Sequence, residues 1–304
     1  MSEPSEWQRR IEGEWHGRPS LFDPTGAWQG FEDIRRSSVF EDGVVTYSMD
    51  GGLEGGGPLA GRFKVGAPFA FGVTDAGADR HYTGPDFYGS GRPYGSFVDA
   101  RYYGPGWQVG LNTWNQTIGD TQVYSSLLFQ GPAVAGCFNG LYTRDPAQVG
   151  DWLRAETANG PVPYILPTKA AGAYAGACEL FGADGKPRGG VQITVELEPI
   201  DLLRTRHHVT WTGDLERRHV VDVRRDGFRS FFEGPDAWGN AQAYGRASFP
   251  RLHLTDGARV EGREFMMDAA PGMGAGTAMA VVYEVFDGNL LSAVLYGVLT
   301  WSSS

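Results

Sequence analysis

One twelve-residue pattern occurs twice in this chain, and it constrains the fold more than any other feature of the sequence. Residues 84–95 and residues 234–245 both fit Gly-Pro-Asp-x-aromatic-Gly-x4-Tyr-Gly, and the two copies start 150 residues apart. A repeat with this long a period indicates two duplicated domains rather than the stacked short units of a solenoid. The chain has 304 residues, which is about the length of two average domains.

A proline-rich segment between the two copies marks the predicted domain boundary. Residues 145–160 are predicted to form a helix, because Pro146 suits an early helical position and Asn159 and Gly160 end the pattern. Residues 161–167 follow as Pro-Val-Pro-Tyr-Ile-Leu-Pro, which is typical of an extended linker. We therefore predict an N-terminal domain of residues 1–160 and a C-terminal domain of residues 161–304.

Turn residues and short strands dominate both halves. Glycine accounts for 45 of the 304 residues, about twice its usual share of about 7%. Short strands between turn signals, such as residues 61–65 and the alternating residues 192–198, indicate an all-β fold of two antiparallel barrels. A short N-terminal helix, in which Trp7 and Ile11 share a face, precedes the first barrel. The glycine-rich residues 51–57 are predicted to form a flexible lid over a barrel mouth.

The charge and cysteine content argue against several classes of partner and site. A formal net charge of -10 opposes binding to nucleic acid or to anionic lipid. Cys137 and Cys178 lie in no CxxC or Cys/His spacing, so we expect no metal, and two buried free thiols are favoured over a disulfide. Residues 1–13 lack the apolar core of a signal peptide, and no apolar stretch approaches 18 residues. These patterns predict a cytoplasmic protein without membrane insertion.

The start of the first unit carries a known pattern. Gly13-x-Trp15-x-Gly17, after a short helix and before a run of strands, resembles the opening of the calycin superfamily of lipocalin-like barrels. Over residues 10–304 the chain resembles bacterial two-domain lipocalin-like proteins and, more remotely, tandem-calycin natural-product cyclases of the Diels–Alderase type and carotenoid hydratases. The resemblance implies two lipocalin-like barrels with a cavity for an apolar small molecule, and it carries over no catalytic residue. Because Tyr174 replaces the motif's Trp in the second unit, that barrel is expected to be degenerate or open.

The repeated Gly-Pro-Asp segment has two interpretations. Pro at the second position of a turn, followed by an Asp that bonds nearby backbone N–H groups, predicts a structural hairpin that folds an aromatic residue over a barrel end. The alternative places Asp86 or Asp236 in a ligand cavity. Four aromatic residues of the two copies are then predicted to contact the ligand: Tyr88, Tyr94, Trp238 and Tyr244.

Residues 107–116 are the richest stretch for a polar site in the first unit. With a strand period of two, Asn112, Trp114 and Gln116 share one face. Two amides and an indole on one face could hold an apolar ligand and polarise its carbonyl group. The alternative is a strand end that runs into a polar turn. Two further aromatic residues are predicted to contact the same ligand: Trp107 and Tyr124.

Candidates for acid–base chemistry are few. His81 precedes the first Gly-Pro-Asp turn, which would bring its imidazole beside Asp86 as an acid–base pair. In the second unit His207 and His208 are adjacent, so a strand would turn one imidazole to each face.

These features predict a cofactor-independent enzyme that holds a hydrophobic, natural-product-like molecule in a barrel cavity. It would catalyse cyclisation, isomerisation or hydration/dehydration, mainly by holding the substrate in a reactive conformation. The predicted catalytic residues are His81, Asp86 and Trp114. Two alternatives stay open: a non-enzymatic carrier of a lipid, pigment or terpenoid, and a structural protein with solidly packed barrels. The expected partners are a small-molecule substrate and, in a homodimer, a second copy of the chain.

Overall fold

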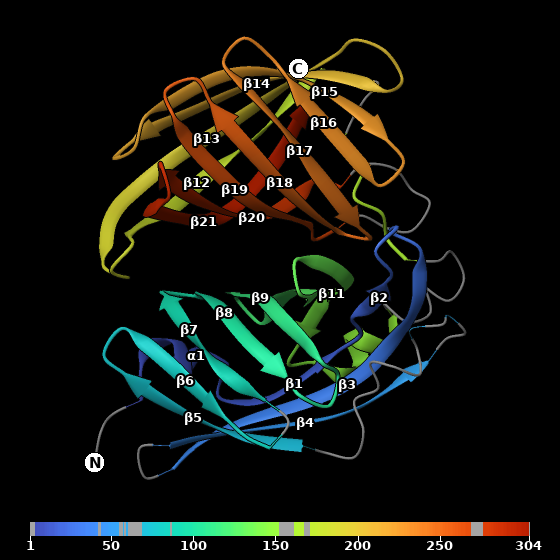
Figure 1. The fold of residues 1–304 in the computed structure, drawn as a ribbon, viewed down its shortest axis with the longest axis vertical. Helices are drawn as coiled ribbons and strands as arrows, with labels where there is room; N and C mark the ends of the chain where they lie inside the picture. Colours follow the sequence, from blue (N-terminus) through green and yellow to red (C-terminus); the bar gives the residue numbers. More distant parts are fainter. Residues whose placement is uncertain are drawn as a thin grey trace. The chain divides into compact units, whose positions relative to one another are not determined.

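The computed structural model of the chain consists largely of antiparallel β-strands in two compact units (Figure 1). Unit 1 spans Met1–Pro161 and unit 2 spans Val162–Ser304. The predicted boundary, between residues 160 and 161, is one residue away from the boundary between these units. The prediction of an all-β fold with two antiparallel barrels is confirmed. The structure describes residues 4–41, 44–54, 57, 59, 69–85, 87–151, 161–166, 171–268 and 276–303.

Each unit consists of one run of strands. The described elements of unit 1 are α1 (Glu6–Ile11), β1 (Gly13–Gly17), β2 (Ser20–Phe22), β3 (Trp28–Glu41), β4 (Val44–Glu54), β5 (Phe69–Ala76), β6 (Asp79–Thr83), β7 (Tyr88–Tyr94), β8 (Phe97–Gly104), β9 (Val109–Ile118), β10 (Thr121–Gln130) and β11 (Ala133–Thr143). Those of unit 2 are β12 (Gly172–Gly182), β13 (Pro187–Pro199), β14 (Arg204–Gly213), β15 (Arg217–Asp226), β16 (Arg229–Glu233), β17 (Ala237–Tyr244), β18 (Ala247–Leu254), β19 (Ala258–Met266), β20 (Ala278–Asp287) and β21 (Leu290–Ser303).

The sheet of unit 1 closes into barrel 1. From β3 to β11 each strand pairs antiparallel with the next, so the chain runs around the sheet as consecutive hairpins. The short strands β1 and β2 each pair with both β3 and β11. These two strands together therefore close the ring.

The sheet of unit 2 closes into barrel 2, a ring in which each strand from β12 to β21 pairs with the next (Figure 1). β12 pairs back with β21, from Gly172 opposite Ser303 to Gly182 opposite Ala293. The long strand β12 thus closes barrel 2, as β1 and β2 together close barrel 1. The expectation of a degenerate or open second barrel was wrong.

A single aromatic residue anchors the first strand of each barrel. In barrel 1 the buried Trp15 donates a hydrogen bond from its indole Nε1 to the carbonyl oxygen of Ile11, at 3.0 Å. In barrel 2 the buried Tyr174 donates from its hydroxyl to the carbonyl oxygen of Gly276, at 2.5 Å, and its ring contacts Trp301. Tyrosine can replace tryptophan here because both combine a large apolar body with one hydrogen-bond donor.

The repeated segment forms the same hairpin in both barrels. Its closing glycines, Gly95 and Gly245, have φ values of 57° and 53°, where residues with a Cβ are disfavoured. Gly89 and Gly239 lie against the neighbouring strand, because an added Cβ would come within 2.0 and 1.9 Å of a backbone carbonyl oxygen. The glycines of the repeat therefore allow two strands to pack closely against each other in each unit.

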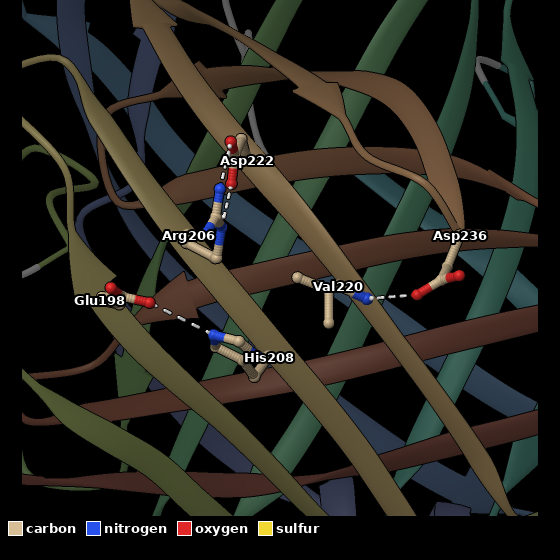
Figure 2. A network of polar contacts seen from close by, with 6 residues as sticks. All are labelled: Glu198, Arg206, His208, Val220, Asp222 and Asp236. Atoms are coloured by element: carbon tan, nitrogen blue, oxygen red, sulfur yellow. Dashed lines mark hydrogen bonds and ion pairs between the residues drawn. The ribbon is translucent and has the colours of Figure 1, made fainter.

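Asp236 of the second copy makes the contacts of a structural turn. Its carboxylate accepts a hydrogen bond from the backbone N of Val220 on β15, at 3.3 Å (Figure 2). Its backbone carbonyl accepts another from the N of Thr255, at 3.0 Å. The counterpart in the first copy, Asp86, lies outside the described residues.

Helix α1 occupies the interior of barrel 1. Trp7 and Ile11 are both buried, and so is Gln8 between them. The side chain of Gln8 donates to the hydroxyl of Ser38 at 2.8 Å and accepts from the guanidinium of Arg80 at 2.9 Å. The space left between α1 and the strands is about 60 Å³.

Several shorter segments were also predicted. Residues 146–151 are helical, and the carboxylate of Asp145 accepts a hydrogen bond from the backbone N of Ala147 at 2.9 Å. Residues 152–160 and the predicted strand 61–65 lie outside the described residues. Residues 51–54, predicted as part of a lid, belong to β4. Cys137 and Cys178 are free and buried. Across the described residues, no helix is both long enough and apolar enough to cross a membrane.

Candidate functional site

The interior of barrel 2 contains a cavity of about 80 Å³, and with its opening to solvent the pocket spans about 650 Å³. Most of its wall is apolar: Leu166, Val195, Val209, Val221, Val223, Phe232, Ala241, Pro250, Leu252 and Val260. Among the described residues, eight further ones contribute polar atoms: Tyr164, His207, Trp211, His219, Ser230, Ser248, Glu264 and Tyr283. An apolar cavity with a few polar groups is the usual form of a small-molecule site.

Equivalent positions in the two barrels differ in their chemistry. The strand register makes Asn115 of β9 the counterpart of Glu264 of β19. Likewise Arg80 of β6 is the counterpart of Ser230 of β16. Barrel 1 thus places an amide and a long guanidinium side chain where barrel 2 has a carboxylate and a small hydroxyl. Because α1 also enters barrel 1, we place the candidate site in barrel 2.

Glu264 is the centre of a three-residue cluster on one wall of the cavity. The hydroxyl of Tyr283, on β20, donates to one carboxylate oxygen at 2.8 Å. The hydroxyl of Tyr164 donates to the other oxygen and also lies 3.7 Å from the sulfur of Met279. Two donors therefore hold the carboxylate from both sides.

Burial shifts the protonation of this cluster. It raises the pKa of Glu264 above that of an ordinary glutamic acid, and the hydrogen bonds from the two tyrosines oppose the shift only in part. Burial and the nearby carboxylate also raise the pKa of Tyr164 and Tyr283 well above the ordinary value. Both phenols therefore stay protonated, while Glu264 titrates closer to neutral pH than an exposed glutamate.

Three nitrogen-bearing side chains line the cavity on β14 and β15. They are His207 and Trp211 on β14 and His219 on β15. The atoms His207 Nε2, Trp211 Nε1 and His219 Nδ1 are buried and have no hydrogen-bond partner among the described residues. A buried polar atom without a partner costs about 1–3 kcal/mol. Burial lowers the pKa of His207 to about 3 and also lowers that of His219, so both rings are uncharged at neutral pH.

The alternation of β14 separates the cavity from the outer surface of the barrel. His207, Val209 and Trp211 line the cavity, and the alternate residues Arg206, His208 and Thr210 lie on the outer face. There Arg206 pairs with Asp222 at 2.7 Å, and His208 lies 3.5 Å from Glu198 (Figure 2). The prediction that His207 and His208 occupy opposite faces of one strand is thus confirmed.

Glu264 and the pair of His207 and His219 come from opposite parts of the ring. β14 and β19 are five strands apart in the ten-strand order, which is halfway around the barrel. One aromatic contact joins the two sides: the rings of Trp211 and Tyr283 lie 5.6 Å apart. A ligand in the cavity would therefore have Glu264 on one side and His207 and His219 on the other.

The predicted catalytic residues of unit 1 are not brought together around a described cavity. His81 is exposed on β6, and Asp86 lies outside the described residues. Trp114 is buried on β9, but the cavity of barrel 1 is lined by its neighbour Asn115, so Trp114 lies on the other face of the strand. Asn112 and Gln116 share that face with Trp114.

The predicted substrate-binding aromatics are scattered over the two units. Tyr88 and Trp238 are 53% and 50% exposed, and Tyr94 and Tyr244 are buried in the packing of their hairpins. Two others are partly buried: Tyr124 lines the cavity of barrel 1, and Trp107 packs against its apolar core.

Sequence reasoning missed most of the cluster in barrel 2. Tyr164 belongs to the segment that we predicted as a linker, and that segment contributes to the barrel interior instead. Glu264 carried no motif, although the alternation of β19 places it on the inner face with Val260. The available signal was a carboxylate at an inner position of a strand whose other inner residues are small or apolar.

The donor set of the site is not that of a metal centre. In the part of the chain that the structure describes, no group of three or more His, Cys, Asp or Glu side chains is arranged to hold a metal ion. The cavity instead combines one carboxylate, two phenols, an indole N–H and two neutral imidazoles. This set can exchange protons with a ligand and form hydrogen bonds to its oxygen atoms.

Comparison with known proteins supports the fold. The sequence matches no protein-family model and no curated protein. A protein of unknown function from the DUF3598 family of Nostoc punctiforme has a similar structure, with a TM-score of 0.65 and 11% identity over 99% of this chain and 100% of that chain. Structures from Bacteroides fragilis and Nitrosomonas europaea align with TM-scores of 0.23 and 0.19 and 7% and 12% identity, over 98% and 94% of this chain and 100% and 91% of theirs, which is too weak for an argument. Together with the two closed barrels, the first similarity fits a two-barrel calycin-like fold.

Proposed function

We propose that barrel 2 is a cofactor-independent isomerase that binds an apolar carbonyl compound and moves a proton on the carbon next to the carbonyl group. The observation that carries the proposal is the position of Glu264, a carboxylate with a raised pKa held by two tyrosines beside a largely apolar cavity. Carboxylates tuned in this way act as general acids and bases near neutral pH.

In the proposed reaction Glu264 is the general base. Its ionised carboxylate takes a proton from the carbon next to the carbonyl group. The electron pair of the C–H bond forms a C=C bond, and the π pair of the carbonyl group moves onto its oxygen to give an enolate. The proton then returns from Glu264 to a carbon of the same ligand, which completes an isomerisation without a net change in atoms or charge. Tyr164 and Tyr283 keep the carboxylate in place through both steps.

Trp211 supplies the donor that the enolate oxygen needs. Its indole N–H is buried, has no partner among the described residues, and belongs to a side chain that lines the same cavity. The ring of Trp211 contacts the ring of Tyr283, and the hydroxyl of Tyr283 binds Glu264, so one side chain lies between the proposed donor and the proposed base. Fixed donors in a dry site stabilise developing negative charge far better than water-exposed donors do.

The size of the cavity limits the part of the ligand that enters it. An apolar cavity of about 150 Å³ holds one benzene ring, and the enclosed space here is about 80 Å³. By this measure the enclosed space holds a carbonyl group with a few carbon atoms, and the rest of a ring or of a larger, natural-product-like molecule would lie in the open mouth. This arrangement supports isomerisation over cyclisation of a long, fully enclosed chain.

A carrier of an apolar small molecule is the second candidate function. The continuous apolar wall favours it, because such a wall binds a ligand by burial alone. A carrier needs no base, so the two functions differ in whether Glu264 exchanges protons with a bound ketone.

Proton exchange on cyclopentanone tests the proposal. In deuterated buffer, the protein should accelerate the loss of the proton NMR signal of the carbons next to the carbonyl group. Glu264→Gln, which keeps the shape of the side chain, should reduce the protein-dependent rate at least about a hundredfold. His81→Ala, at an exposed site in unit 1, should leave that rate unchanged. Binding without exchange would favour the carrier, and a protein that neither binds nor exchanges cyclopentanone would overturn the proposal.

A further inference from the structure

The wall opposite Glu264 contains polar groups that the proposed reaction does not use. The imidazoles of His207 and His219 face the cavity, whereas proton transfer at carbon requires only the carboxylate and one donor to the carbonyl oxygen. His219 is 95% buried, since only 5% of its surface is exposed. Its Nδ1, like the Nε2 of His207, has no partner among the described residues.

These two histidines are near neighbours on adjacent strands. In the pairing of β14 with β15, His207 lies opposite Val221 and His219 lies opposite Val209. The two imidazoles are therefore diagonal neighbours on the inner face, because each histidine lies two residues along its strand from the partner of the other. Their free nitrogens can thus serve one ligand group together.

The described lining of the cavity offers no positively charged side chain to an anionic ligand. The described lining of the cavity includes no Lys or Arg, and both imidazoles are uncharged at neutral pH. The arginines near the two histidines on β14 and β15 do not line the cavity, and two of them form ion pairs: Arg206 with Asp222, and Arg217 with Asp256 at 2.6 Å. A carboxylate or phosphate would lose its hydration here without gaining a counter-ion, which is strongly unfavourable. A neutral hydroxyl suits an imidazole in either tautomer, because it both donates and accepts hydrogen bonds.

We propose that His207 and His219 form a second polar subsite and that the ligand of barrel 2 is an uncharged hydroxy-ketone on an apolar frame. Its carbonyl group lies at the Glu264 side and its hydroxyl at the histidine side. This inference rests on the proposed function and defines its substrate class. The unpartnered nitrogens on β14 and β15 are the observation that carries it.

A matched series of ring ketones tests this subsite. 3-Hydroxycyclopentanone and 3-methylcyclopentanone have nearly the same size, and 3-oxocyclopentanecarboxylate adds a negative charge at the same ring position. Dissociation constants measured by calorimetry should show the hydroxyl compound binding at least about threefold more tightly than the methyl compound. The carboxylate should bind at least about tenfold more weakly than the methyl compound.

Substitution of the subsite should remove this preference. In His219→Leu, the hydroxyl and methyl compounds should bind equally well, whereas His208→Leu, on the outer face of β14, should keep the preference for the hydroxyl compound. The unmodified protein offers a second readout that needs no variant. The ¹⁵N resonances of His207 Nε2 and His219 Nδ1 should move when the hydroxyl compound binds and stay in place with the methyl compound.

The outcomes separate this inference from the proposed function. If ketones bind and exchange but the hydroxyl group improves neither affinity nor the imidazole signals, the subsite is refuted and the isomerase proposal stands. If the carboxylate binds as tightly as the hydroxyl compound, the ligand class is wrong. If no ketone of the series binds, both proposals fall together.

Discussion

Inside barrel 2 the hydroxyl of Tyr283 lies 2.8 Å from a carboxylate oxygen of Glu264. The two residues come from adjacent strands, β20 and β19, and Tyr283 also carries the ring that contacts Trp211 across the cavity. Tyr283 therefore links the proposed base to the proposed donor. Tyrosine combines apolar packing with one hydrogen bond, which lets it do both in a largely apolar interior.

Removing this hydroxyl should make Glu264 a weaker acid. The hydrogen bond from Tyr283 lowers the pKa of Glu264, so Tyr283→Phe should raise it further while keeping the ring against Trp211. The loss of one hydrogen bond should also slow cyclopentanone exchange about threefold to tenfold. A pH titration of ¹³C-labelled glutamate signals measures the shift.

The barrel offers a matched control for this change. Tyr296 donates a bond of the same length, 2.8 Å, to Glu179, which does not line the cavity. Tyr296→Phe should therefore leave the titration of Glu264 and the exchange rate unchanged. An equal effect of both variants would show that Tyr283 acts only through general packing.

His207 should make barrel 2 less stable as the pH falls. Its pKa is about 3 in the folded state and about 6.5 when unfolded, so between these values the unfolded chain binds more protons. The free energy of unfolding should therefore decrease as the pH falls below about 6.5, by at most about 1.4 kcal/mol per pH unit from this residue. Urea denaturation of the protein and of His207→Gln, between pH 7 and pH 5, measures the difference in slope.

Glu264 contributes with the opposite sign. Its folded-state pKa is raised, so it costs stability as the pH rises through and above its unfolded value. Comparing one protein with its His207→Gln variant cancels this contribution. Parallel pH curves for the two proteins would mean that His207 is not held neutral in the folded state.

Substitution of Gly239, in the second copy of the repeat, should disturb the packing of two neighbouring strands. A Cβ at Gly239 would lie 1.9 Å from a backbone carbonyl oxygen of the neighbouring strand, so the strands must separate. Gly239→Ala should lower the free energy of unfolding of unit 2 by about 2 kcal/mol or more, as overpacked sites do. Gly190→Ala is the matched control, because the nearest atom to its added Cβ is 3.6 Å away, and its effect should stay within about 0.5 kcal/mol. Urea denaturation followed by circular dichroism measures both, and equal stabilities would contradict the close approach.

The helix within barrel 1 should depend on one buried amide. Gln8→Ala removes the hydrogen bonds to Ser38 and Arg80 and leaves Arg80 with Asp75, at 2.7 Å. We expect a loss of about 2 kcal/mol in the stability of unit 1, since a buried guanidinium loses a partner. Arg10→Ala, on the exposed side of the same helix, should cost less than about 0.5 kcal/mol. Hydrogen exchange of the α1 amides reports the difference, and similar protection in both variants would argue against this role of Gln8.

The architecture could be predicted from the sequence because it follows from short-range patterns. The repeat at residues 84–95 and 234–245 required two similar units, and the alternation of residues 192–198 agrees with β13. The expected opening of barrel 2 was wrong because it took Trp15 as essential. Tyr174 provides the same combination of bulk and one donor, which a motif comparison does not register.

The site was harder to predict because it depends on which residues meet across a closed ring. Glu264 and Tyr164 are 100 residues apart in the chain, and only the folding of unit 2 brings them into contact. Periodicity assigned His207 and His208 to opposite faces, yet it could not say which face was the inner one. For Trp114 the predicted face was the wrong one. Its strand face is polar and aromatic, as expected of a ligand site, but the cavity of barrel 1 lies on the other side of the strand.

Intermolecular nuclear Overhauser effects from bound cyclopentanone would locate the ligand, because they report which side chains surround it. We expect contacts to the ring protons of Trp211 and Tyr283 in barrel 2, and their loss when a larger residue fills the cavity in Ala241→Trp. Contacts to Tyr82 or Tyr102 in barrel 1, with none to Trp211 or Tyr283, would contradict this location of the ligand.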